Sequence, residues 1–312
     1  MIKATIKATG FLKSERDGYW PWLFILPVLL GLTVFTYGPI AASFGLSFTY
    51  WNLLGKPAFV GFENYQAVMA DPLFWKSFGV TWLFVLASTV AEVLLALLIA
   101  VKLNQMAAGF LSRFQPLFRS AYFLPFITPM VSVSLVWGWL YEPQYGLFNW
   151  LLQSLHLIHA PVAWLYDPDT ALWAVVILRV WKNMGYTVLI FLAALQGVPE
   201  SILESADLDG ASPFKRFFQV MLPMITPTMF FVVIVSMINA FQVFDAVYLL
   251  TQGGPDHSTE LLVYWMFKNA FEFYKIGPAS AIAYILFVVI LLLTLLQWQM
   301  RKRWVLHEED AA

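Results

Sequence analysis

Six long apolar runs constrain this chain more than any other feature of its sequence. They are residues 20–48, 77–101, 120–141, 170–196, 224–252 and 276–300. Each exceeds the roughly 20 residues that a helix needs to cross the hydrocarbon core of a bilayer. Backbone polar groups in lipid must be satisfied within the segment, and the short alternating runs of a β-barrel are absent from the sequence. The sequence therefore predicts an all-α, polytopic membrane protein with six transmembrane helices.

The composition supports a lipid-facing surface. Hydrophobic residues make up 60% of the chain and charged residues only 12%, whereas a soluble domain carries about 25% charged residues. The net charge of −1 gives no reason to expect nucleic-acid binding. There is no Cys, and the four His residues lack the spacing of metal ligands. We therefore expect neither catalytic residues nor a metal site.

The distribution of Lys and Arg predicts the orientation. Most of them lie before the first run, between the second and third, between the fourth and fifth, and after the sixth. The other side receives only Lys56, Lys76, Lys268 and Lys275. Because the cytoplasmic side carries the excess of positive charge, residues 1–19 are predicted as a cytoplasmic segment, 20–300 as the transmembrane domain and 301–312 as a cytoplasmic tail. The first run is too long for a signal peptide, so an uncleaved first helix is expected.

Two stretches resemble each other, Leu-Pro-Phe-Ile-Thr-Pro at residues 124–129 and Leu-Pro-Met-Ile-Thr-Pro at residues 222–227. Each follows basic residues, and each is expected where a helix enters the membrane from the cytoplasm. Proline is tolerated in a first helical turn, because its missing N–H would have no partner there. The likeness is interpreted as a shared way of entering a helix rather than as a duplicated half.

Residues 199–223, between the fourth and fifth runs, predict a helix–turn–helix. Ser201 and Glu204 have the spacing of a capping box, so a helix is expected to begin near Ile202. Gly210 can adopt a positive φ and end that helix, and the Ser-Pro pair at residues 212–213 can begin a second one. One interpretation is an amphipathic helix that holds the loop to the membrane surface.

The same segment resembles a known motif. Its pattern Glu-Ser-Ala-x-x-Asp-Gly-Ala, followed by Leu-Pro, is similar to the EAA motif of ATP-binding cassette (ABC) importer permeases. In that family the motif forms a coupling helix that docks on a cytoplasmic ATPase. The resemblance implies this role for Glu204, Ser205, Ala206, Asp209, Gly210 and Ala211. Position 205 is most often Ala in the family, and Glu204 could cap its own helix, contact the ATPase, or do both.

Two further stretches, residues 181–199 and 236–255, resemble consecutive helices and the outer Gly-Gly-Pro turn of carbohydrate-uptake permeases. The resemblance implies the type I ABC importer permease fold in a bacterial or archaeal plasma membrane. It also implies a heterodimer with a second permease, two ATPase subunits, an extracytoplasmic solute-binding protein and a sugar or sugar-like substrate. The chain has no phosphate-binding loop of the form G-x-x-x-x-G-K-[ST], so ATP and Mg are expected on the ATPase.

Four charged residues are predicted at membrane depth, Glu92, Arg179, Lys182 and Asp245. Because isolated charges in lipid cost several kcal/mol, such residues usually pair or line a cavity. Arg179 and Lys182 share one helix face, and the two carboxylates could neutralise them. Both an ion-pair network that fixes helix packing and a polar lining of a transport path remain open.

By the same resemblance, substrate contacts are expected on the fourth and fifth spans. The matching positions are Gly185, Tyr186, Ser236, Asn239 and Gln242. Amide, hydroxyl and aromatic groups of this kind suit a sugar, which presents hydroxyls and flat apolar faces. The alternative function is a secondary transporter or channel that uses the four charges as an ion relay, and the sequence does not distinguish among sugars, polyols and glycerol phosphate esters.

Overall fold

The computed structural model describes residues 20–106, 113 and 115–304. The predicted cytoplasmic segment 1–19 and most of the predicted tail 301–312 lie outside these residues. The prediction of an all-α protein is confirmed. Within the described ranges the only sheet is a two-stranded hairpin, in which Thr49 pairs with Phe59.

The first half of the chain contains a long apolar helical stretch, a small hairpin and a bent pair of helices. The elements are α1 (Trp20–Leu32), the π-helical η1 (Thr33–Tyr37), α2 (Gly38–Leu46), β1 (Thr49–Tyr50), β2 (Ala58–Phe59), α3 (Glu63–Ala70), α4 (Pro72–Met106), α5 (Gln115–Ile127), α6 (Met130–Leu140) and α7 (Leu147–Ser154).

The second half contains the other long spans and the segment that carries the motif. Its elements are α8 (Pro168–Gln196), α9 (Glu200–Leu208), α10 (Pro213–Lys215), η3 (Arg216–Met221), α11 (Leu222–Met224), α12 (Thr226–Phe241), α13 (Asp245–Leu250), α14 (Leu262–Phe267), η4 (Lys268–Glu272) and α15 (Ile276–Trp304).

Four described helices are long and apolar enough to cross a membrane: Trp22–Leu46, Pro72–Gln105, Pro168–Gln196 and Ile276–Arg301. Two bent pairs bring the number to six if each pair forms one span. Ser120–Ile127 meets Met130–Leu140 at 107°, and Pro213–Met224 meets Thr226–Phe241 at 67°. The predicted spans are thus present, but two of them are broken.

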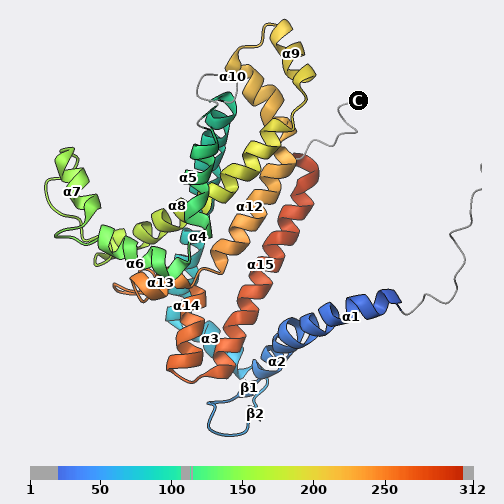
Figure 1. Cartoon of the computed structure of the whole chain (residues 1–312). Coiled ribbons are helices and arrows are strands. Elements are labelled where there is room, and N and C mark those ends of the chain that lie inside the picture. Colours follow the sequence, from blue (N-terminus) through green and yellow to red (C-terminus); the bar gives the residue numbers. More distant parts are fainter. Residues whose placement is uncertain (1–19, 107–112, 114, 305–312) are drawn as a thin grey trace, which may run out of the picture.

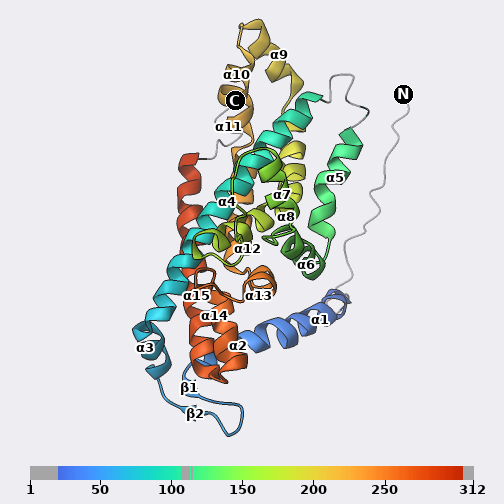
Figure 2. The same ribbon diagram turned by 90° about the vertical axis from the view of Figure 1, so that its left-hand side faces the viewer.

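The core lies where α4, α8 and α12 pack together. Fully buried side chains such as Phe84, Leu178 and Phe191 fill the space between these helices. By contrast, the first apolar helix is not buried against the rest of the chain. It extends away from the bundle at an angle, as Figures 1 and 2 show. Its apolar surface is therefore available to lipid or to another subunit.

The break between α5 and α6 corrects the expectation for residues 120–141. The sequence predicted one continuous span with prolines in its entry turn, but Pro125 lies inside α5 and Pro129 precedes α6 in an extended conformation. Proline disfavours the helical conformation of the residue before it, here Thr128, and donates no hydrogen bond, so α5 ends at Ile127. The expectation holds for Pro227, which lies in the first turn of α12.

The fifth span is also shorter than predicted. The apolar run 224–252 is divided, because α12 ends at Phe241 and α13 starts only at Asp245. Figure 1 shows α9 and α10 projecting beyond α15 at one end of the bundle, and β1, β2 and α3 near the opposite end.

Candidate translocation site and coupling segment

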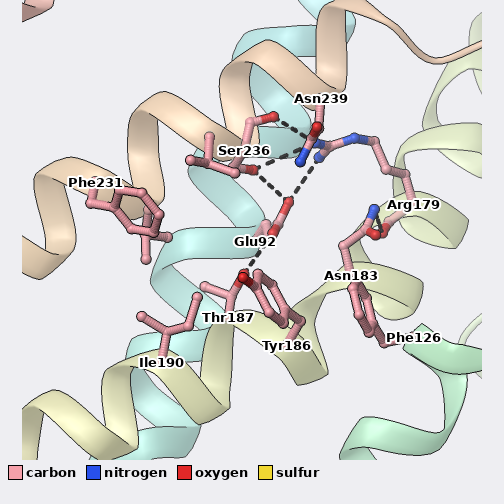
Figure 3. A pocket seen from close by; sticks show the side chains of 12 residues that line it. Glu92, Phe126, Arg179, Asn183, Tyr186, Thr187, Ile190, Phe231, Ser236 and Asn239 are labelled. Carbon is pink, nitrogen blue, oxygen red and sulfur yellow. Dashed lines mark hydrogen bonds and ion pairs between the residues drawn. The ribbon is translucent and has the colours of Figure 1, made fainter. Parts of the chain in front are cut away.

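A buried ion pair joins the three central helices. The Glu92 carboxylate on α4 accepts a hydrogen bond of 2.9 Å from Arg179 Nη1 on α8. It also accepts hydrogen bonds from the hydroxyls of Thr187 on α8, at 2.8 Å, and Ser236 on α12, at 2.6 Å. Arg179 Nη2 donates to the Ser236 carbonyl oxygen at 2.8 Å. Figure 3 shows these side chains converging at one point between the helices.

This network explains how two charges are tolerated inside the bundle. The side chains of Glu92 and Arg179 are only 4% and 3% exposed, so each would be costly without the other. Together with the two hydroxyls they form a compensated cluster. The predicted neutralisation of Arg179 by Glu92 is therefore present, and it links helices that are far apart in the sequence.

Beside the network lie two neighbouring cavities that share lining residues, and we call them the two lobes of one cavity. The first lobe has a volume of about 230 Å³ and the second about 330 Å³. Arg179, Asn183 and Asn239 line both lobes. The remaining polar or aromatic residues that line them include Glu92, Phe126, Lys182, Tyr186, Thr187, Ser236, Gln242 and Asp245. The cavity thus combines amide and hydroxyl groups with aromatic rings.

Lys182 and Asp245 line the second lobe but do not form a close ion pair. Instead, Lys182 Nζ donates to the carbonyl oxygens of Phe126 and Thr128, both at 3.1 Å, and reaches that of Pro125 at 3.5 Å. These carbonyls belong to the break between α5 and α6. Among the described residues, no carboxylate oxygen lies within the 4.0 Å ion-pair limit of this ammonium group. The suggestion that Asp245 neutralises Lys182 directly needs this correction.

Of the five predicted substrate contacts, four line the cavity and one does not. Tyr186, Ser236, Asn239 and Gln242 are at the cavity wall. Gly185 is instead buried where α8 crosses α5, and a Cβ added there would overlap the Tyr122 carbonyl oxygen. Gly185 therefore allows two backbones to meet, and nothing in the geometry gives it access to a solute.

The cavity residues that the sequence reasoning missed include Asn183, Thr187 and Phe126. Asn183 and Thr187 follow Arg179 at intervals of four residues, so a polar stripe along one face of α8 could have indicated both. Phe126 gave no such signal. Its ring reaches the cavity only because α5 breaks, and it stacks on Tyr186 with ring centroids 4.7 Å apart.

Residues 199–223, which we call the coupling segment after their predicted role, form the predicted helix–turn–helix with a different start. α9 begins at Glu200 after Pro199, so Ser201 lies within the helix, where its carbonyl oxygen accepts from Ser205 Oγ at 2.8 Å. The expected capping box is therefore wrong. Gly210 ends the segment's first helix with φ of 75°, and the Ser212 side chain caps the second, as predicted.

The coupling segment is held together internally and leaves a face exposed. Arg216 pairs with Asp207 at 2.7 Å, which ties the second helix to the first. Leu203 and Phe217 pack toward the bundle core, whereas Leu208 is 89% exposed. Of the motif residues, Glu204, Ser205, Asp209 and Gly210 are exposed, and Ala206 and Ala211 are half-buried.

Comparison with known proteins identifies relatives over nearly the whole length. The family model for the binding-protein-dependent transport system inner membrane component matches residues 92–304. The probable ABC transporter permease protein YesP of Bacillus subtilis is 35% identical over 306 residues, which cover 97% of this chain and 96% of the relative.

Two further matches extend the comparison. The trehalose/maltose transport system permease protein MalF of Thermococcus litoralis is 34% identical over 284 residues, covering 90% of this chain and 92% of the relative. A chain in the crystal structure of a bacterial alginate ABC transporter, in complex with alginate pentasaccharide-bound periplasmic protein, superposes with a TM-score of 0.79 at 20% identity. That alignment covers 92% of this chain and 95% of the other. The structural match supports the predicted type I importer permease fold, and the sequence matches show that this chain belongs to the inner membrane component family of binding-protein-dependent transport systems.

Proposed function

We propose that this chain forms the translocation pathway for a sugar or sugar-like solute in an ATP-driven importer. The observation that carries the proposal is the two-lobed cavity between α5, α8 and α12. Its amide and hydroxyl groups can exchange hydrogen bonds with a polyhydroxylated solute, and the Phe126–Tyr186 pair offers an aromatic surface.

The charges around the cavity favour an uncharged solute. Glu92 and Arg179 compensate each other, and the cavity's remaining charges, Lys182 and Asp245, have opposite signs. A bound anion would need a free cation, since charged groups are strongly disfavoured at membrane depth without a partner. The name of the trehalose/maltose relative fits this solute class, whereas the structural relative's alginate is a saccharide of acidic type.

The partners follow from the architecture of the coupling segment. In this proposal the exposed surface of α9 docks on an ATPase, which binds ATP and Mg, because the chain itself has no phosphate-binding loop. Two ATPases and a second permease complete the membrane complex, and a solute-binding protein delivers the substrate from outside. The chain is oriented with both termini in the cytoplasm of a bacterial or archaeal cell, because Lys and Arg are concentrated on that side.

In this proposal ATP binding drives transport by changing which conformation of the complex is the more stable. ATP binding can move the spans only if it stabilises one arrangement over another. Closure of the ATPase pair would displace the coupling segment, and the cavity would open alternately to the two sides.

The test is uptake by proteoliposomes that contain this chain, its partner permease and the ATPase subunits. Uptake of a radiolabelled oligosaccharide is expected only when ATP is inside the vesicles at the ATPase face and the binding protein is present outside. Uptake that proceeds without ATP and follows an imposed ion gradient would refute the proposal and support a secondary transporter.

A further inference from the structure

The end of α5, at the break of the bent span, contacts a lysine from another span. Nζ of Lys182 on α8 lies 3.1 Å from the carbonyl oxygens of Phe126 and Thr128 and 3.5 Å from that of Pro125. The same ammonium group is 5.9 Å from the centroid of the Phe126 ring. One side chain thus contacts both the backbone and a ring at the point where α5 stops.

This contact has a clear physical basis. The last carbonyl groups of a helix lack partners within it and carry the negative end of the helix dipole. After Ile127 the Thr128 N–H still donates to the Pro125 carbonyl oxygen at 3.3 Å, and the chain then turns through the 107° bend toward α6. A cation at this position satisfies orphan carbonyls in a place where water is scarce. Stacking of Phe126 on Tyr186 holds the same end of α5 to α8.

A second acceptor faces the same ammonium group. Asp245, the first residue of α13, lines the lobe that Lys182 also lines, and its charge attracts that of Lys182. The two groups are not in ion-pair contact in this structure. Lys182 therefore contacts uncharged carbonyls of α5 while a carboxylate on a different element lies across the cavity lobe.

We propose that Lys182 is a positioning residue that exchanges between these two partners during transport. In the arrangement seen here it fixes the end of α5 to α8. When the bent span moves away, the ammonium group passes to Asp245, so that it has a hydrogen-bond acceptor in both states. The inference rests on the proposed function, because it gives the α5–α6 break a role in opening the cavity.

The experiment measures import by the reconstituted complex with the variants Lys182→Met, Lys182→Arg, Asp245→Asn and the double variant Lys182→Met/Asp245→Asn. Lys182→Met is expected to lower the maximal import rate by about tenfold, which corresponds to about 1.4 kcal/mol. Half-saturation for the solute should stay within about twofold. Lys182→Arg should recover much of the rate, because a guanidinium can also donate to carbonyls.

The double variant discriminates exchange from simple packing. If Lys182 and Asp245 act as a pair, the double variant should import about as fast as Lys182→Met alone, because the effects of coupled residues do not add. A double variant whose loss of import rate equals the product of the two single losses would overturn the exchange. A wild-type import rate in Asp245→Asn would also overturn it. Lys102→Met, which removes an exposed lysine on α4, is the matched control and should import normally.

Two features keep the outcome interpretable. If Lys182→Met does not assemble, Asp245→Asn still tests the second partner, since it leaves the carbonyl contacts of Lys182 intact. A wild-type complex that fails to import refutes the proposed function, whereas normal import by Lys182→Met refutes this inference.

Discussion

Removing either member of the Glu92–Arg179 pair should destabilise the bundle strongly. In Arg179→Met, the Glu92 carboxylate keeps the hydroxyl donors of Thr187 and Ser236 but loses its counter-charge. In Glu92→Gln, the guanidinium stays buried with neutral acceptors only, which are the Ser236 carbonyl and hydroxyl oxygens and the amide oxygen of the new side chain. Each single change leaves a buried and uncompensated charge.

The expected size follows from the burial. Both side chains are at most 4% exposed, and breaking such a pair by removing one partner costs about 3–5 kcal/mol. The double variant Glu92→Gln/Arg179→Met removes both charges at once, so it should lose less than either single variant. The departure from additivity should then be at least about 3 kcal/mol.

The assay is equilibrium unfolding of the purified chain in lipid nanodiscs, compared across the two single variants and the double variant. A double variant whose loss equals the sum of the single losses would refute the pairing. The same variant also separates the two functional readings, because it should retain ATP-driven import if the pair only fixes helix packing. An ion relay through Glu92 would abolish transport in the double variant.

Two glycines give further predictions, each with a matched glycine as control. Gly185→Ala should lower the thermal unfolding midpoint, because the added Cβ would overlap the Tyr122 backbone. Its control is Gly79→Ala on α4, where the Cβ meets nothing within 4 Å and the midpoint should not fall. Equal midpoints in the two variants would contradict the close approach of α5 and α8. Gly210→Pro should uncouple ATP hydrolysis from import in membrane-inserted protein, because proline cannot adopt the φ of 75° that ends α9. Gly61→Ala, at another positive φ in the opposite end of the bundle, is its control, and normal uptake by Gly210→Pro would count against the coupling role.

The sequence predicted the spans well because their signal is local. Apolar length alone places a helix in a membrane, so all six runs contain helices in the structure. The breaks were harder to predict. A proline such as Pro129 is compatible with a helix entry or with a mid-span bend, and the choice depends on whether another span supplies a donor to the freed carbonyls. Here Lys182 supplies that donor, and it lies 54 residues after Thr128 in the chain.

The candidate site was predicted in composition rather than in geometry. Charges at membrane depth must find partners, which is why the two carboxylates were expected to neutralise the two cations, and Glu92 and Arg179 do meet although 87 residues separate them. The same rule could not decide between Asp245 and backbone carbonyls for Lys182. It also could not show that Gly185 serves helix packing, because glycine suits a close backbone approach and a solute contact equally well.

The local signals of the coupling segment were partly misleading. Ser201 and Glu204 have the spacing of a capping box, but Pro199 already holds the extended conformation that starts the helix at Glu200. The side chain of Glu204 makes no hydrogen bond within the described part of the chain and is exposed. Its contact with an ATPase stays a prediction.

Cross-linking from the tip of α9 tests the central claim most directly. The chain has no Cys, so Leu208→Cys, at a position that is 89% exposed, would be its only thiol. In the assembled importer, a short bifunctional reagent should join this position to the ATPase subunit, and the yield should change when ATP is trapped. A Leu208→Cys thiol that reacts only with membrane-impermeant reagents added outside the cell, and never joins an ATPase, would contradict the account.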